Sequence, residues 1–175
     1  DSFDAVIDGI RSAKLAGLDP VKINVVAMAG VNDDELVDFA RFGRTEGVEV
    51  RFIEFMPLDA DGAWQRSAVL SQADIVARID EVYPLVAIPK GNAPAERFTF
   101  ADGAGAPGGT HIGVIASVTQ PFCATCDRVR LTADGKLRNC LFSADETDLR
   151  ALLRAGAGDD EVAAAIEGCV EDKRA

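Results

Sequence analysis

The sequence lacks any apolar run of the ~18 residues that a membrane-spanning helix requires. No signal peptide is expected either, because the first ten residues given, DSFDAVIDGI, are acidic and already amphipathic. These absences predict a cytoplasmic protein with no membrane partner. Histidine is equally scarce, and the single His111 provides no catalytic dyad.

Positive charge is also in short supply. Lysine and arginine number 18 against 29 acidic residues, which gives a net charge of −11. Such a balance argues against general nucleic-acid or membrane binding. Hydrophobic residues still make up 48% of the 175 positions, which is enough to bury a core.

Against this background, residues 121–142, PFCATCDRVRLTADGKLRNCLF, concentrate three of the four cysteines. Cys123 and Cys126 form a CxxC, and Cys140 follows after thirteen residues. Between them Asp134-Gly135 is the residue pair that a tight β-hairpin turn prefers. A hairpin that places Cys140 opposite about Val129 returns it toward the CxxC, which is compatible with one metal centre.

Basic residues gather in the same stretch of this acidic protein and predict one specific anionic ligand. They are Arg128, Arg130, Lys136 and Arg138. Arg128 and Arg130 are two apart on an expected strand, so both side chains would point to the same face. Guanidinium groups bind phosphate and carboxylate oxygens bidentately.

Four interpretations of the cysteines remain open on spacing alone. A thioredoxin-like CxxC leaves Cys140 and the arginines unexplained, and a disulfide framework fits poorly with a cytoplasmic chain. Structural zinc needs a fourth ligand, either His111 or Cys169. Three thiolates on a 4Fe-4S cluster leave one iron without a protein ligand. The neighbouring arginines favour this last interpretation, because a purely structural metal site does not need them.

The hydrophobic periodicity predicts an α/β chain. A helix beginning at Ser2 and ending near Gly17, a strand at 21–28, a helix capped by Asn32 with Glu35, and a strand at 48–57 indicate parallel βα units. A Ser71-capped helix to about Val82 follows. Short strands are expected near 85–88, 96–100 and 111–118, and helices at 145–155 and 159–172. We therefore expect two domains, residues 1–57 and 58–175.

Three motifs resemble one known family. FCATCDRVRLTADGKLRNCLF is similar to the C-terminal cluster motif of the molybdenum cofactor biosynthesis protein A family, the radical S-adenosylmethionine GTP 3',8-cyclases. VKINVVAMAGVNDDEL and VRFIEFMPL resemble later barrel strands of that family. The resemblance covers essentially the whole chain and the last half to two-thirds of a family member. It implies a partial TIM-like radical SAM barrel (1–57), followed by a small α+β domain with a C-terminal 4Fe-4S cluster (58–175).

The resemblance implies a lyase that converts GTP to 3',8-cyclo-GTP. In this family an N-terminal CxxxCxxC holds a second 4Fe-4S cluster, which cleaves S-adenosylmethionine. The resulting radical abstracts hydrogen from C3' of the GTP ribose, and C3' is joined to C8 of guanine. The product passes to the downstream cyclic pyranopterin monophosphate synthase. A homodimer is a further expectation, and nucleic acid is not an expected partner.

Matched by position, the cysteine trio would hold the C-terminal cluster, whose open iron would bind the purine. The implied site residues are Cys123, Cys126 and Cys140 for the cluster; Lys22, Arg51, Arg128, the Val129 backbone and Arg130 for GTP; and Met56 for S-adenosylmethionine. Asn24 shares a strand face with Lys22 and is expected to line the site with Met56. The alternative for Lys22 is a salt bridge to a nearby carboxylate such as Glu54.

The chain departs from the family in having no CxxxCxxC, and the family's Gly-Gly tail is missing. We expect a fragment that lacks the SAM-cleaving cluster and is inactive alone. Cys169 is expected to be an ordinary half-buried cysteine. The alternative function is a zinc module with four cysteines, or three plus His111, that binds an anionic partner. A nucleotide-binding domain without metal is a third option.

Overall fold

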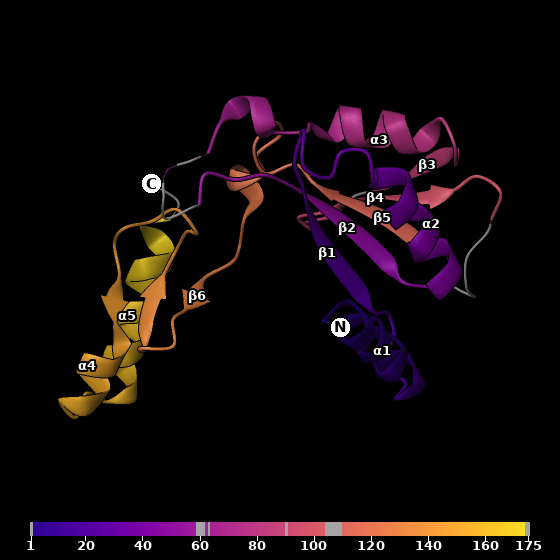
Figure 1. Ribbon diagram of the computed structural model, residues 1–175. Coiled ribbons are helices and arrows are strands. Elements are labelled where there is room, and N and C mark those ends of the chain that lie inside the picture. Colours follow the sequence, from indigo (N-terminus) through magenta and orange to yellow (C-terminus); the bar gives the residue numbers. More distant parts are fainter. Residues whose placement is uncertain (1, 59–61, 63, 90, 104–109, 174–175) are drawn as a thin grey trace. The chain divides into compact units, whose positions relative to one another are not determined.

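The computed structural model describes residues 2–58, 62, 64–89, 91–103 and 110–173 (Figure 1). The chain divides into two compact units, Asp1–Thr125 and Cys126–Ala175. No helix among these residues combines the length and the apolarity needed to cross a membrane.

The first unit is built on a five-stranded mixed sheet in the order β1-β2-β5-β4-β3. Its strands are β1 (Lys22–Ala27), β2 (Glu49–Glu54), β3 (Leu85–Ile88), β4 (Glu96–Phe100) and β5 (His111–Ile115). β1, β2 and β5 are parallel, whereas β4 is antiparallel to both β5 and β3. The expected α/β class is therefore confirmed. The domain boundary expected after residue 57 lies, along the sequence, between β2 and β5, and these two strands pair directly in the same sheet.

Helices cover one face of this sheet. The first unit contains α1 (Ser2–Leu15), α2 (Leu36–Glu46), the short 3-10 helix η1 (Arg66–Ala68), α3 (Gln72–Asp80) and a second 3-10 helix, η2 (Cys123–Thr125). α2 and α3 pack on the same side of the strands (Figure 1). Phe52, Ile112 and Val114 of the sheet meet Leu36 and Ile75 of these helices in the buried core. The opposite face is not covered by any helix of the described part of this unit.

The helix starts show where local sequence is decisive and where it is not. Ser71 caps α3, as its sequence predicts, and the structure adds a capping box with Asp74. The cap expected at Asn32 is wrong, because α2 begins only after Glu35. Asn32 instead accepts from the Met28 backbone N–H at 2.9 Å and donates to the Val26 carbonyl at 3.0 Å. Its side chain therefore stabilises the turn after β1.

The second unit contains the cysteine hairpin. Its elements are β6 (Arg130–Leu131), β7 (Lys136–Arg138), β8 (Thr147–Asp148), α4 (Leu149–Arg154) and α5 (Asp159–Glu171). The hairpin around Asp134-Gly135 is confirmed, but Arg130 pairs with Arg138. If this register is continued along the chain, the residue opposite Cys140 lies one position away from the expected Val129. The helix expected from 145 is also shorter, because Thr147 and Asp148 pair with β7 first.

Gly135 fixes how the hairpin meets α4. Its φ is +83°, a conformation that L side chains rarely adopt. A Cβ at this position would also lie 2.7 Å from the Arg150 Cβ. The Arg150 N–H donates to the Gly135 carbonyl at 3.0 Å. The turn that the sequence requires for a hairpin therefore also provides a tight contact with the following helix.

Candidate functional site

The three cysteines of the motif are free thiols that belong to different units. Cys123 lies in η2 of the first unit and is exposed, whereas Cys126 and Cys140 belong to the second unit. The Arg128 backbone N–H, followed by its guanidinium and the Lys173 ammonium, lowers the pKa of Cys126 to about 7. A thiolate is the form that binds metal, so the surroundings of Cys126 fit a cluster ligand.

Two cations contact Cys126 directly. Arg128 Nη2 lies 3.4 Å from the Cys126 Sγ, and Lys173 Nζ lies 3.3 Å from it. Lys173 also donates to the Arg128 carbonyl. Sequence reasoning missed Lys173, which is 47 residues from Cys126 and belongs to no local motif. Arg130 begins β6, whereas Arg128 precedes the strand, so the expected strand alternation does not extend to Arg128.

Replacement of Lys173 by alanine should raise the pKa of Cys126 above about 7, because one of the groups that stabilise the thiolate is lost. The pH dependence of iodoacetamide alkylation at Cys126 in the metal-free chain measures this change. Lys136→Ala is the matched control, since Lys136 is paired with Glu146. An unchanged alkylation profile in Lys173→Ala would contradict the contact.

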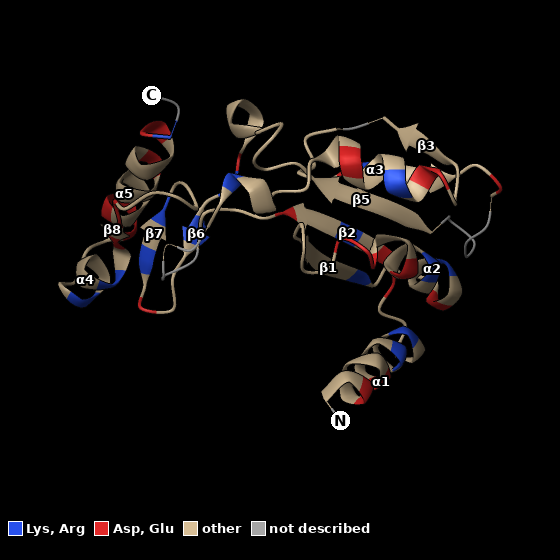
Figure 2. Ribbon diagram, turned by 45° about the horizontal axis from the view of Figure 1, so that its top comes forward, with Lys and Arg blue, Asp and Glu red and all other residues tan. Residues whose placement is uncertain are grey.

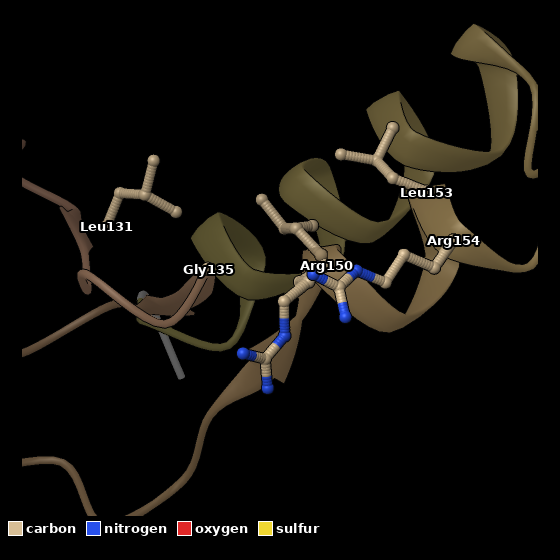
Figure 3. Close-up of a pocket in the computed structure, with 6 residues that line it drawn as sticks. Leu131, Gly135, Arg150, Leu153 and Arg154 are labelled. Atoms are coloured by element: carbon tan, nitrogen blue, oxygen red, sulfur yellow. The ribbon is translucent and has the colours of Figure 1, made fainter.

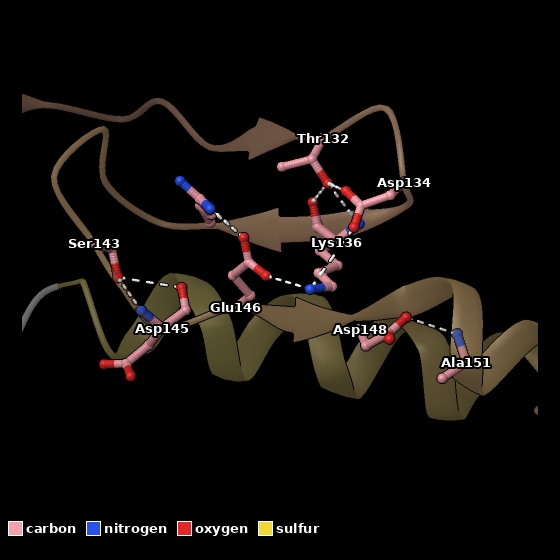
Figure 4. A network of polar contacts seen from close by, with 9 residues as sticks. Thr132, Asp134, Lys136, Ser143, Asp145, Glu146, Asp148 and Ala151 are labelled. Atoms are coloured by element: carbon pink, nitrogen blue, oxygen red, sulfur yellow. Dashed lines mark hydrogen bonds and ion pairs between the residues drawn. The ribbon is translucent and has the colours of Figure 1, made fainter. Parts of the chain in front are cut away.

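Glu146 pairs two of the four basic residues in the motif (Figure 4). Its carboxylate accepts from Lys136 Nζ at 2.7 Å and from Arg138 Nε at 2.7 Å. These cations hold the pKa of Glu146 below its usual value. Arg130, in contrast, makes no ion pair with any described residue. Glu146 therefore pairs with Lys136 and Arg138, whereas Arg128 contacts Cys126.

Within either unit, the described residues include no group of three His, Cys, Asp or Glu that could hold a metal ion. This absence of a grouped site among the described residues applies equally to the additional zinc ligands and to the cysteine trio. Cys169, expected from the sequence to be half-buried, is instead buried in α5 with 7% exposure. His111 belongs to β5, where its Nδ1 lies 3.1 Å from Arg97 Nη2. Because a guanidinium can only donate, this nitrogen accepts a hydrogen bond from Arg97.

Three of the residues predicted in the first unit, Lys22, Asn24 and Arg51, share the uncovered face of the sheet. Asn24 on β1 pairs with Arg51 on β2, and Lys22 pairs with Glu49. Lys22 and Asn24 are exposed, and Lys22 makes no ion pair with any described residue. Basic residues on β1 and β2 are drawn blue in Figure 2. The expectation that Lys22 and Asn24 point to one face is consistent with this register.

Glu54 is not the partner of Lys22. Glu54 pairs in register with Ala27, so its side chain lies on the helix-covered face, where it is fully buried. The carboxylate accepts from the backbone N–H groups of Gln72, Val118 and Thr119 at 3.0, 2.8 and 2.7 Å. Glu54 is therefore excluded as the salt-bridge partner of Lys22. Met56, two residues beyond β2, is half-buried at the carboxyl end of the strand.

A separate pocket of about 320 Å³ lies in the second unit between the hairpin and α4 (Figure 3). Its lining is mainly apolar and includes Leu131, Gly135 and Leu153, with Arg150 and Arg154. None of the residues predicted from sequence lines this pocket. The candidate residues lie instead in the cysteine motif and, separately, on the uncovered sheet face of the first unit.

Residues 48–175 match the family described as Molybdenum Cofactor Synthesis C. Over its whole length the chain is 46% identical to a GTP 3',8-cyclase of Mycobacterium ulcerans, of which it covers 49%. It is 47% identical to the GTP 3',8-cyclase of Streptomyces coelicolor over 93% of the chain and 47% of that protein. For the Rhodopirellula baltica GTP 3',8-cyclase the identity is 48%, over 98% of the chain and 48% of the relative.

The chain thus spans about half the length of the curated relatives that it matches. The match to the family covers well over half of the chain and includes the cysteine motif, the hairpin and most of the sheet. The chain therefore belongs to the Molybdenum Cofactor Synthesis C family.

Proposed function

We propose that this chain supplies the GTP-binding and C-terminal cluster part of a GTP 3',8-cyclase of molybdenum cofactor biosynthesis. The observation that carries the proposal is the surroundings of Cys126. Within one unit, its thiol pKa is lowered to about 7 by Arg128 and Lys173. Arg130 follows on β6 without an ion pair among described residues, while Glu146 pairs Lys136 and Arg138.

The residues for a cluster are Cys123, Cys126 and Cys140. Three thiolates on a 4Fe-4S cluster leave one iron that can accept a purine nitrogen or oxygen. The donor chemistry fits, because all three thiols are free and Cys126 is readily deprotonated. Their assembly around one cluster is part of the proposal. A structural zinc module is not better supported.

Arg128 and Arg130 are the proposed partners of the GTP triphosphate, together with the Val129 backbone. A triphosphate of charge about −4 favours several guanidinium and ammonium groups. In the first unit Lys22 and Arg51 are the proposed further contacts. Anchoring a nucleotide at both its base and its phosphates restricts the ribose between them, which selective hydrogen abstraction requires.

S-adenosylmethionine is the proposed second substrate, with Met56 and Asn24 beside it. This chain carries no CxxxCxxC, so we expect that the 175 residues alone do not cleave S-adenosylmethionine. β1 and β2, with α2 between them, are the part of the fold that we assign to a TIM-like barrel. A homodimer and transfer of the product to cyclic pyranopterin monophosphate synthase complete the proposal.

Arg128→Ala and Arg130→Ala should each weaken GTP binding by about 1.5–3 kcal/mol, because each removes charged hydrogen bonds to phosphate. Anaerobic calorimetric titration of the reconstituted chain measures the dissociation constant, and iron analysis shows whether the cluster is retained. Arg154→Ala, an exposed arginine of the same unit, is the control. Unchanged affinity in the Arg128/Arg130 double variant would refute the assigned role.

A further inference from the structure

One carboxylate is buried on the uncovered face of the sheet, where the other charged residues of the described strands are Lys22, Arg51 and Arg97. Glu49 lies on β2 with 4% exposure, although its neighbour Lys22 on β1 is exposed. Its Oε1 accepts from Arg51 Nε at 2.6 Å, and its Oε2 accepts from Arg97 Nη2 at 3.1 Å. Each oxygen therefore holds a different guanidinium. A buried carboxylate is costly unless it is paired in this way.

Gly113 on β5 provides the room for this arrangement. It pairs in register with Arg51 on one side and with Arg97 on the other. A Cβ at Gly113 would lie 3.0 Å from the Arg51 Cγ and 3.6 Å from the Glu49 Oε1. The missing side chain thus lets the stem of Arg51 and the carboxylate of Glu49 lie over β5, where Arg97 reaches them.

The contact leaves the outer end of Arg51 available. Glu49 binds the Nε, and the two terminal nitrogens of Arg51 donate to no described residue. A guanidinium held at Nε keeps these two nitrogens in a fixed orientation, and they are donors suited to a phosphate oxygen. Fixing a flexible side chain before binding reduces the entropy that binding must otherwise remove.

We infer that Glu49 is a positioning residue: with Arg97 and Gly113 it holds the Arg51 guanidinium in the orientation that receives the anionic substrate. The inference rests on the proposed function, in which Arg51 contacts GTP. It gives Arg97 and Gly113 a role that no motif in the sequence indicates. It also accounts for a carboxylate on a face that would bind an anion.

The sign of the effect separates positioning from simple charge. If only the charge mattered, removing the negative charge of Glu49 would tighten GTP binding, because the carboxylate repels the triphosphate. Loss of a positioning contact does the opposite. Glu49→Gln keeps the side-chain shape, but its amide nitrogen would face one guanidinium and repel it. Gly113→Ala keeps every charge and displaces Arg51 instead.

The test is anaerobic calorimetric titration of GTP into the reconstituted full chain. Arg51→Ala should weaken binding about tenfold or more, and Glu49→Gln and Gly113→Ala each about tenfold. In the Arg51→Ala background Glu49→Gln should add nothing, because Glu49 acts through Arg51. The exposed Glu35 and the helical Gly9, which has open space around it, provide the controls Glu35→Gln and Gly9→Ala.

The single histidine gives a second readout. The pKa of His111 is lowered by burial and by Arg97, whereas Glu49 raises it. Glu49→Gln should therefore lower the pKa of His111 further, as followed by an NMR pH titration of its ring. The same spectrum shows whether the variant is folded.

Distinct outcomes overturn the two levels of the argument. Tighter or unchanged GTP binding by Glu49→Gln, with Arg51→Ala still weakened, would overturn the positioning role and leave the proposed function intact. The positioning role would also be overturned if Glu49→Gln reduced GTP affinity by the same factor in the unmodified chain and in the Arg51→Ala background. No effect of Arg51→Ala, or no GTP binding by the unmodified chain, would overturn the Arg51 contact and the inference with it.

Discussion

Cys126→Ser should abolish most iron binding by the chain after anaerobic reconstitution with iron and sulfide, whereas Cys169→Ser should leave it unchanged. The unmodified chain is expected to bind about four irons per molecule. Serine is a poor substitute for a thiolate, and two remaining cysteines cannot hold a cluster that needs three. Cys123→Ser and Cys140→Ser should behave in the same way.

Cys169→Ser, in the second unit, is the matched control. Cys169 has the same chemistry as Cys126 but is buried in α5. Its substitution tests whether the loss is specific to the motif. Iron and acid-labile sulfide analysis, with electron paramagnetic resonance of the reduced sample, measures the cluster. A colourless chain that takes up no iron and retains one tightly bound zinc would contradict the proposal. Equal iron loss in Cys169→Ser would contradict the assignment of ligands.

Glu54→Gln should lower the free energy of unfolding of the first unit by about 3 kcal/mol or more. The carboxylate is fully buried at the end of β2. It accepts from the first residue of α3, Gln72, and from the segment after β5 that leads to the cysteine motif. An amide nitrogen in place of one oxygen would face backbone N–H groups and leave buried donors unsatisfied.

The chain provides its own probe for this measurement. Trp64 is the single tryptophan, and its Nε1 donates to the carbonyl of Phe55, the residue after Glu54, at 2.9 Å. Urea unfolding followed by Trp64 fluorescence therefore reports on this part of the first unit. Glu35→Gln makes the same chemical change at an exposed position and should alter stability by less than about 0.5 kcal/mol. A similarly small effect of Glu54→Gln would show that the buried contacts contribute little.

The strands of the sheet were predictable because β-branched residues and the two-residue period act locally. VKINVVAM and VEVRFIEF each became strands, and β3 and β4 match their expected ranges. The Ser71 capping box was equally local. Asn32 was mispredicted because the same side chain can cap a helix or bind the backbone of the preceding turn. Which of these it does depends on how the turn leaves β1.

The sequence also showed which cysteines and basic residues lie close together along the chain, but it did not show which charged groups pair with them. The cysteine spacing, the Asp-Gly turn and the presence of basic residues can be seen in one short segment. Nothing in that segment indicates that Lys173 contacts Cys126 or that Glu146 pairs Arg138. Lys173 and Glu146 lie outside this segment and meet it only in the tertiary structure.

The sequence by itself determined the order of the α-helices and strands in the first unit, the hairpin, the residue types proposed to bind the cluster, and the family. Only the tertiary structure decided that β5 lies between β2 and β4. It also decided that Glu49 binds Arg97, 48 residues away, and that Glu54 accepts a hydrogen bond from Val118 instead of pairing with Lys22. The physical reason is that local patterns depend on neighbours within a few residues. Charge pairing depends on strand order and register, which are fixed by burying one complete face of the sheet.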